Sequence, residues 1–281
     1  MHTYDEVTVA VREVSKSYRA DNKRSVFRSS QSGRHHKRVQ AVRNVSLIAH
    51  RGECVGVLGR NGSGKSTLMR LVAGNEAPDK GEILVSETPT LLNVSAALQP
   101  RLDGFTNIKL GLLAQGVAKE DIDELAKDIV EFADIGDAIN RPMATYSSGM
   151  GARLKFAIST AVKREVLLID EALGTGDASF NERAQERMAG FLEDAGTIFF
   201  VSHSMEAVRS MCTRAVWLEK GEVIADGPIE SIGLLYRKWM ARTARKNTEA
   251  AESLTRRVKR IYRPPAIDFD PMMHTRELQE P

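Results

Sequence analysis

Short apolar runs, each long enough for one β-strand, recur along this chain. Apolar and polar residues interleave over residues 7–14 and 45–48, as in strands with one buried face. Residues 54–58, 166–169 and 197–201 are almost wholly apolar, as in the buried strands of a parallel sheet. The pattern therefore predicts five strands.

Helical patterns fill the intervals between these runs. Residues 179–192 and 205–211 are predicted to be helices, and a Lys220-Gly221 turn within residues 215–224 predicts a β-hairpin. Strands that alternate with helices indicate an α/β fold with a mostly parallel sheet, and the chain contains no internal repeat. The clearest helix, over residues 122–132, places five apolar residues on one face: Ile122, Leu125, Ala126, Ile129 and Phe132.

Size and composition exclude several classes of protein. The 281 residues are 42% hydrophobic and 27% charged, as is usual for soluble globular proteins. The apolar runs are much shorter than the roughly 20 residues of a membrane-spanning helix, and the N-terminus lacks the features of a signal peptide. Cys54 and Cys212 stand far apart, which argues against a metal or disulfide scaffold. We therefore expect a protein of the reducing cytosol.

The net charge of +3 conceals two basic segments. Residues 19–39 hold seven Lys and Arg against one Asp, and residues 237–281 hold eleven against six Asp and Glu, so the rest of the chain is acidic. Such segments are attracted to anionic surfaces, either lipid headgroups or a polyanion. A solvated loop and a frayed tail explain the same charges equally well.

A glycine-rich segment after the run at 54–58 carries the strongest chemical signal. Its sequence GRNGSGKS matches the phosphate-binding pattern G-x-x-x-x-G-K-[ST] and stands between a strand and a helix, as that motif requires. Lys65 is expected to bridge the β- and γ-phosphates, and Ser66 to bind Mg²⁺ through its hydroxyl. Thr67 is expected to contact the α-phosphate side. The predicted nucleotide-binding residues are Gly59, Arg60, Asn61, Gly62, Ser63, Gly64, Lys65, Ser66 and Thr67.

Two acidic residues follow the apolar run at 166–169. The carboxyl end of a parallel strand lies at the same sheet edge as the phosphate loop. Asp170 is therefore expected to hold Mg²⁺, directly or through water, and Glu171 to polarise the attacking water as a general base. A pair of solvated acids is the alternative. Kinases of small molecules share the first acid, so the pair alone does not separate an ATPase from a kinase.

His203 and Asp177 extend the same predicted edge. His203 follows the run at 197–201 and precedes a helix, which predicts a position within reach of a γ-phosphate as sensor or charge stabiliser. Asp177 lies in a glycine-rich turn shortly after the two acids and is interpreted as a linker between two nucleotide sites. A lone His in a sequence is more often structural or exposed.

The stretch TYSSGM at residues 145–150 runs straight into a helical pattern. A Ser before an apolar periodic run is typical of a helix N-cap. Free backbone N–H groups, a hydroxyl and the positive end of a helix dipole are also what a phosphate needs. The residues of this stretch leave both interpretations open.

The order of these motifs resembles the nucleotide-binding subunit of an ABC transporter over about residues 7–230. YSSGM stands where that family carries LSGGQ and departs from it at Tyr146, Ser148 and Met150, while Ser147 and Gly149 are kept. Within the family, AVRNVSL, RLKFAIS, LLIDEALGTGDASF and TIFFVSHS resemble the ATP-binding subunits of exporters of teichoic acid and related cell-surface polysaccharides. DEALGTGD, in place of the more usual DEPTSALD, is especially typical of that subgroup.

The resemblance implies an α/β fold, that of a P-loop NTPase of the ABC ATPase type. Such a fold has a mostly parallel core sheet, an antiparallel β subdomain and an α-helical subdomain. We expect the ATPase domain over residues 1–236, with the helical subdomain at about 94–161 and the basic loop at 19–39. A basic tail without a strand pattern is expected over 237–281, and therefore no polymer-binding β-sandwich.

The resemblance also implies roles for single residues. Tyr18 is expected to stack on adenine, and Asp177 to link the two sites of a dimer. Ser147, Ser148 and Gly149 are expected to contact ATP held by the other subunit. Gln99 is the nearest Gln to the family's glutamine loop, whose residue adds to the metal site, although it is offset from the standard position.

The implied function is that of an ATPase with ATP and Mg²⁺ as ligands. Its partners would be a polytopic membrane permease and a second ATPase subunit in a two-plus-two complex at the cytoplasmic face of the cell membrane. It would export a lipid-linked anionic polymer and bind no nucleic acid. The alternatives are a soluble ABC ATPase acting on ribosomes or DNA, an ABC subunit for another substrate, a P-loop kinase and a non-enzymatic interaction module.

Overall fold

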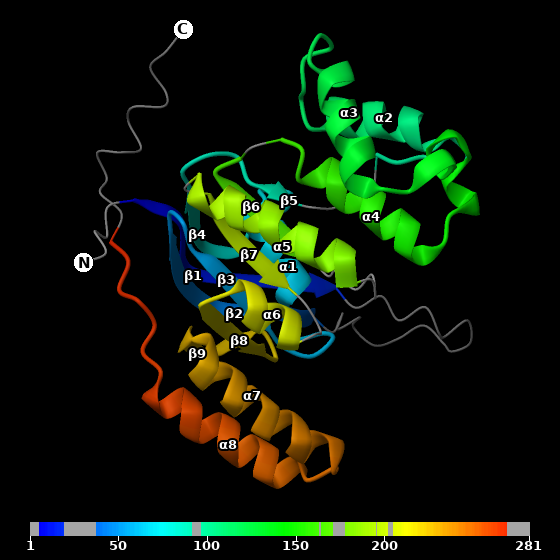
Figure 1. Ribbon diagram of the computed structural model, residues 1–281. Coiled ribbons are helices and arrows are strands. Elements are labelled where there is room, and N and C mark those ends of the chain that lie inside the picture. The colour runs from blue at the N-terminus through cyan, green and yellow to red at the C-terminus, as the bar shows by residue number, and fades with distance from the viewer. Residues whose placement is uncertain are drawn as a thin grey trace, which may run out of the picture.

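The computed structural model describes residues 6–19, 38–91, 97–162, 164–170, 178–194, 196–201 and 205–268. These residues form two sheets with helices packed on them, and a group of helices that projects from the sheets (Figure 1). The α/β class with a mostly parallel sheet, predicted from the sequence, is confirmed.

The larger sheet is built around β3, whose five residues are all buried. Strand β3 pairs in parallel with β7 on one side and with β8 on the other, so neither of its edges meets water. Apolar residues throughout the strand therefore match a position that is covered on both faces. In spatial order the strands are β5 (Thr90–Leu91), β6 (Val166–Asp170), β7 (Thr197–Val201), β3 (Cys54–Leu58), β8 (Arg214–Glu219) and β9 (Glu222–Pro228).

The smaller sheet is antiparallel, with β1 (Val7–Arg19) between β2 (Arg38–His50) and β4 (Lys80–Val85). Its first two strands are much longer than the runs predicted at 7–14 and 45–48. The register shifts on both sides of Val14, and Glu13 has a positive φ of 50°. An irregularity of this kind interrupts the alternation of apolar and polar residues. The alternation in the sequence therefore stops before the pairing of the two strands does.

Both ends of the basic loop expected at 19–39 belong to strands. Arg19 is the last residue of β1, and Arg38 and Val39 are the first residues of β2. Arg19 pairs with Arg38 across the ladder. Residues 20–37 lie outside the described residues.

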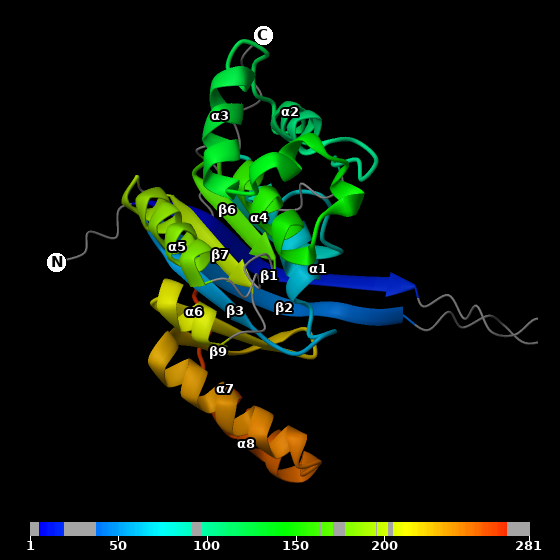
Figure 2. The ribbon, with the colours of Figure 1, turned by 45° about the vertical axis from the view of Figure 1, so that its right-hand side comes forward.

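Helices cover both faces of the parallel sheet. Helix α1 (Lys65–Val72) and the antiparallel sheet share one core with Val55, Val57 and other residues on the same face. The opposite face packs against α5 (Ala178–Glu193), α6 (Met205–Met211) and later helices, as Figure 2 shows. Alternate residues of β3 therefore supply two cores.

A third core lies within the projecting helical group. It consists of α2 (Gly104–Ala114), α3 (Ile122–Ala133) and α4 (Ser148–Ser159). The helix predicted at 122–132 is confirmed, although Leu125 and Phe132 are only partly buried on it. Phe132 packs against both this core and the core next to it, and its ring stacks on Phe156 with centroids 5.8 Å apart and meets Phe180 edge-on.

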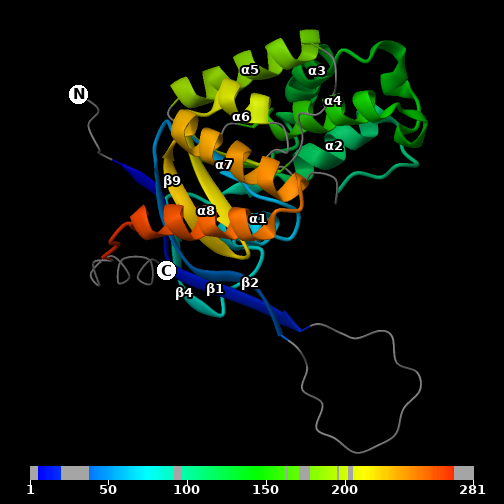
Figure 3. The ribbon, with the colours of Figure 1, turned by 90° about the horizontal axis from the view of Figure 1, so that it is seen from below.

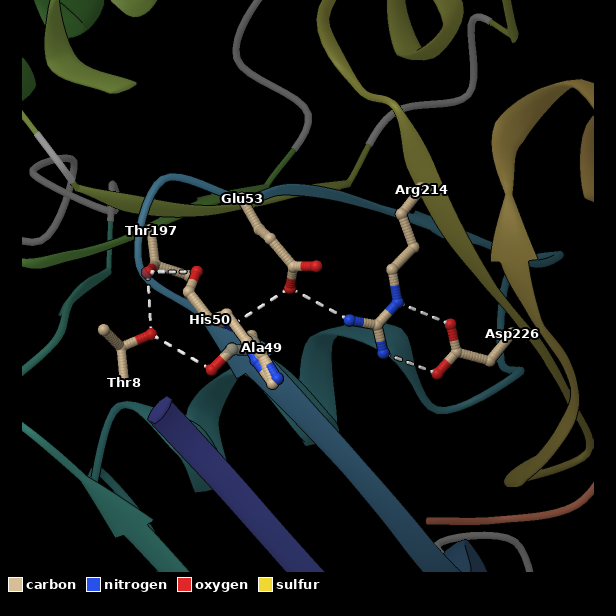
Figure 4. A network of polar contacts seen from close by, with 7 residues as sticks. All are labelled: Thr8, Ala49, His50, Glu53, Thr197, Arg214 and Asp226. Carbon is tan, nitrogen blue, oxygen red and sulfur yellow. Dashed lines mark hydrogen bonds and ion pairs between the residues drawn. The ribbon is translucent and has the colours of Figure 1, made fainter. Parts of the chain in front are cut away.

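The two sheets are also joined at the edge where β3 begins. Figure 4 shows the Glu53 carboxylate between the backbone N–H of His50 (2.9 Å) and the Arg214 guanidinium (2.9 Å). The Thr197 hydroxyl donates to the His50 carbonyl at 3.0 Å and lies 2.7 Å from the Thr8 hydroxyl. These polar contacts connect β1 and β2 with β7 and β8, so the antiparallel sheet is fixed to the parallel one.

The domain boundary expected at 236/237 falls within a continuous helix. Helix α7 (Ile229–Ala244) crosses it and forms a hairpin with α8 (Thr248–Ile261), which packs beside β9 (Figure 3). Trp239 is 4% exposed, and its ring lies 5.5 Å from that of Trp217 in β8. Basic residues on the outer faces conceal these anchors in the sequence. Among the described helices, none is both long and apolar enough to span a bilayer.

Replacement of Trp239 by Ala tests whether α7 belongs to the folded domain. We expect a loss of about 3–5 kcal/mol in the free energy of unfolding, because a large buried ring leaves a cavity. Urea unfolding followed by circular dichroism measures it. Met240, which is 40% exposed on the same helix, is the control, and Met240→Ala should change stability by no more than about 0.5 kcal/mol. Equal effects of the two substitutions would contradict the packing.

Candidate functional site

Strands β3, β6 and β7 end at the same edge of the parallel sheet. Val201 of β7 pairs with Val57 on one side and with Asp170 on the other, so the three residues stand in one row across the sheet. Adjacent strands are about 4.8 Å apart, which puts the backbone of Asp170 roughly 10 Å from that of Val57. The glycine-rich loop begins two residues after Val57. Asp170 and this loop therefore lie at one edge.

The loop turns sharply and passes directly into α1. Ser63 N–H donates to the Arg60 carbonyl at 3.0 Å, and Gly64 caps α1 in a left-handed conformation with φ 108°. A Cβ on Gly64 would lie 2.4 Å from the Ala41 carbonyl oxygen, so this position excludes a side chain. Because the N–H groups of a helix point toward its N-terminus, the first ones of α1 face the loop, where an anion is stabilised by the helix dipole.

Lys65 bends back across this loop. Its Nζ donates to the carbonyls of Gly59 at 2.6 Å and Arg60 at 3.0 Å, and the residue is 7% exposed. The ammonium is thus held within the turn by backbone dipoles. A cation held beside the start of a helix makes the loop a candidate phosphate-binding cradle.

The loop is braced by the hairpin between β8 and β9. Gly221 N–H donates to the Ser63 carbonyl at 2.9 Å, and the Gly221 carbonyl accepts from Arg43 N–H at 2.8 Å. Lys220 and Gly221 both have positive φ, 52° and 83°, as a two-residue hairpin turn requires. The hairpin predicted at this turn is confirmed, but its contact with the loop was not foreseen.

Glu219 and Tyr236 are further residues near the loop that the sequence did not indicate. Burial raises the pKa of the Glu219 carboxyl, while Lys220, Arg60 and Lys65 favour its charged form. Burial also raises the pKa of the Tyr236 phenol, and the nearby Glu219 charge adds to this effect. Because Tyr236 belongs to α7, the C-terminal hairpin reaches the neighbourhood of the loop.

Tyr18 is held by its hydroxyl. The hydroxyl bonds to the Glu76 carboxylate and accepts from Arg70 Nη2 at 3.3 Å, and Arg70 Nε lies 2.8 Å from the Glu76 carboxylate. The bond to Tyr18 is the main cause that raises the pKa of Arg70. These contacts with Arg70 of α1 and with Glu76, which follows α1, fix the Tyr18 ring near the end of β1.

The stretch TYSSGM lies on the helical group. Ser147 is the N-cap of α4, and its hydroxyl accepts from Met150 N–H at 3.2 Å, so the predicted N-cap is confirmed. Ser147 and Ser148 are both exposed. Tyr146 packs on the start of α2, where a Cβ on Gly104 would lie 2.3 Å from its hydroxyl oxygen. The exposed cap therefore follows directly after a residue that is packed against α2.

For several predicted site residues, the structure describes no contact with the glycine-rich loop. Gln99 is exposed, and its backbone is bound to the Asn107 side chain at the start of α2, with N···O distances of 2.6 and 3.0 Å. Glu171, Asp177 and His203 lie outside the described residues. Among the residues whose positions are described, no group of His, Cys, Asp and Glu could hold a metal ion.

The fold and this edge define an ATP-binding cassette. A dimeric cassette, MJ0796 in a post-hydrolysis state bound to ADP and Pi, matches with a TM-score of 0.65 and 22% identity over 79% of this chain and 98% of that one. The family model for the ABC transporter matches residues 42–174. The predicted arrangement of parallel core sheet, antiparallel sheet and helical group is confirmed.

Curated relatives share the sequence over most of the chain. The teichoic acids export ATP-binding protein TagH of Bacillus cereus is 44% identical over 238 residues, which are 83% of this chain and 43% of that protein. TagH of Staphylococcus epidermidis is 35% identical over 248 residues, 88% of this chain and 94% of that protein. The chain belongs to the ABC transporter family, and within it to the teichoic acids export ATP-binding proteins. It spans about half the length of the Bacillus relatives it matches.

Two glycines of the loop are needed for different reasons: one for its backbone conformation, the other also for lack of space. Gly62 has φ 78° with nothing within 4 Å of a Cβ, whereas a Cβ on Gly64 collides with backbone. We expect Gly62→Ala to cost about 1 kcal/mol of unfolding free energy, and Gly64→Ala about 3 kcal/mol or more. Urea unfolding of the nucleotide-free protein measures both. Equal losses would show that the close approach to Ala41 does not constrain the loop.

Proposed function

We propose that this chain is the ATP-binding and hydrolysing subunit of an ABC exporter that moves lipid-linked teichoic acid or a related cell-wall polysaccharide across the cytoplasmic membrane. The observation that carries the proposal is the meeting of the phosphate cradle and Asp170 at one sheet edge. The exposed N-cap at Ser147, on a separate helical group, supports a second contact with nucleotide. The names of the relatives support the choice of substrate.

The cradle residues bind the phosphates of ATP. Lys65 exchanges its two carbonyl partners for phosphate oxygens, and the N–H groups of the loop donate to the same anion. Ser66 lies in the first turn of α1, at the sheet edge where the backbone of Asp170 ends β6. These two residues would supply a hydroxyl and a carboxylate, the oxygen ligands that suit Mg²⁺. When bound, Mg²⁺ neutralises charge on the β- and γ-phosphates.

Hydrolysis is assigned to residues that follow β6 and β7. Glu171 takes a proton from the attacking water, and His203 contacts the γ-phosphate. Both residues follow strands that end at the cradle's edge. Tyr18 stacks on the adenine ring and is held for this by Glu76 and Arg70.

Two copies of the chain share each nucleotide. Ser147 and Gly149 of one copy close over ATP held by Lys65 of the other, and Asp177 links the two sites. The exposed α4 N-terminus supplies N–H groups and a positive dipole for a γ-phosphate. Closure is driven by charge-assisted hydrogen bonds that form only when ATP bridges both copies. A membrane permease bound at the cytoplasmic face converts closure into transport.

Glu171→Gln tests the hydrolytic assignment. The substitution keeps the size of the side chain but removes its basicity, so ATP hydrolysis should fall by about 100-fold or more. ATP should still bind, and size-exclusion chromatography should show a stable dimer in its presence. Lys65→Ala is the control that should lose both hydrolysis and the ATP-dependent dimer. Normal turnover in Glu171→Gln would contradict the base assignment.

The same variant tests the export assignment in cells. When this variant replaces the natural chain, lipid-linked polymer should accumulate on the cytoplasmic side of the membrane, because the closed dimer cannot reopen without ATP hydrolysis. Extraction and quantification of that polymer measure the effect. An unchanged polymer level, together with abolished ATP hydrolysis, would leave the ATPase assignment standing and reject the polymer as substrate.

A further inference from the structure

A groove of about 930 Å³ lies between α7, α8 and β9. It is at the sheet edge opposite the phosphate cradle, since its lining includes Arg214 at the start of β8 and His50 at the end of β2. We call it the C-terminal groove. Its apolar lining comes mainly from both helices: Ile232, Leu235, Leu254, Val258 and Ile261.

Four cations surround this apolar lining. Lys238 and Arg242 come from α7, Arg257 from α8, and Arg263 from the segment after α8. Within the described residues, none of the four forms an ion pair with a carboxylate. Arg263 Nη1 donates only to the carbonyls of Arg260 at 2.8 Å and Tyr262 at 3.1 Å, so the four side chains keep a net positive charge that attracts an anion.

The other charged groups of the groove are already paired. Arg214 donates to both oxygens of Asp226, at 2.7 and 2.8 Å, and to Glu53 at 2.9 Å (Figure 4). Asp226 is the carboxylate among the lining residues, and this bidentate pair occupies it. Arg214 is therefore fixed to the sheet, and the excess positive charge rests on the four outer cations.

Tyr262 is half-buried and lines one wall of the groove. Burial raises the pKa of Tyr262 to about 12, and the nearby Asp226 charge adds to this effect. The phenol therefore stays neutral, and its hydroxyl lies 3.4 Å from the Ser46 carbonyl. Ile261 at the groove is 75% exposed, which leaves a large apolar side chain uncovered beside the cations.

We propose that the C-terminal groove binds a single anionic lipid molecule, with a phosphate headgroup among the four cations and an acyl chain on the apolar lining. A purely polar anion would leave the apolar lining wet, and a neutral lipid would leave the cations unpaired. The volume is that of a site for one small molecule. The inference is independent of the ATPase assignment, because the groove and the cradle lie at opposite sheet edges.

Calorimetry with the full chain tests the ligand class. The probes are dioctanoyl phosphatidic acid, dioctanoyl phosphatidylcholine and inorganic phosphate, all as monomers in solution. We expect phosphatidic acid to bind at least about tenfold more tightly than either other probe, because it alone satisfies both the cations and the apolar lining. No binding of phosphatidic acid, or equal binding of inorganic phosphate or phosphatidylcholine, would overturn the proposal.

Matched substitutions locate the site. Arg242→Gln with Arg257→Gln removes two groove cations, whereas Arg237→Gln with Arg260→Gln removes two exposed cations from the same helices outside the groove. The first pair should weaken phosphatidic acid binding about tenfold or more, and the control pair by less than about twofold. ATP hydrolysis should be unchanged in both. If both pairs weakened phosphatidic acid binding equally, the lipid would be attracted by the overall charge of the helices, and the proposed site in the groove would be overturned.

A third variant protects the test against misfolding. Ile261 is mostly exposed, so Ile261→Ser should fold normally and still lose phosphatidic acid affinity, with Met240→Ser as its control. A synthetic peptide of residues 268–281, which carries four of the chain's acids, should not compete with the lipid. Unchanged affinity in Ile261→Ser, or effective competition by the peptide, would overturn a lipid as occupant.

Discussion

The structure depends on the parallel pairing of β3 with a neighbour on each side. All five residues of this strand are buried, and they alternate between two cores. Because its edges and faces are covered, β3 has one possible register, and its end fixes where the glycine-rich loop begins. Because Val57 pairs with Val201 and Val201 pairs with Asp170, the register of β3 also determines where β6 ends. A one-residue slip would turn the apolar residues of each core to the other face.

The loop is held by the rest of the molecule as much as by its own sequence. Gly221 bonds to Ser63 on one side and to Arg43 on the other, so the cradle is joined to the β8–β9 hairpin and to β2. The C-terminal helices pack on that same hairpin through Trp217 and Trp239. The C-terminal helices and the cradle thus contact the same hairpin, although the C-terminal groove itself opens at the far edge.

The sequence predicted the elements whose chemistry is local. Periodicity located β3, β7 and α3, and the GKS motif located the cradle. It could not predict contacts between distant segments, such as Gly221 with Ser63 or Tyr18 with Glu76. The long ladder of β1 and β2 was missed where an irregularity near Glu13 interrupts the alternation. The sequence predicts a tail over 237–281, where the structure has the second half of α7 and α8, because their outward basic residues outnumber a few buried anchors.

In the proposed mechanism, each nucleotide is shared between the cradle of one copy and Ser147 of the other. Co-expression of a Lys65→Ala chain with a Ser147→Asp chain tests it, because Asp still caps α4 but repels a phosphate. Each variant alone should be inactive, whereas a mixed dimer contains one intact site. Purified mixtures should regain about one quarter of wild-type ATP hydrolysis, since half of randomly formed dimers are mixed. A mixture no more active than its parents would contradict the shared site.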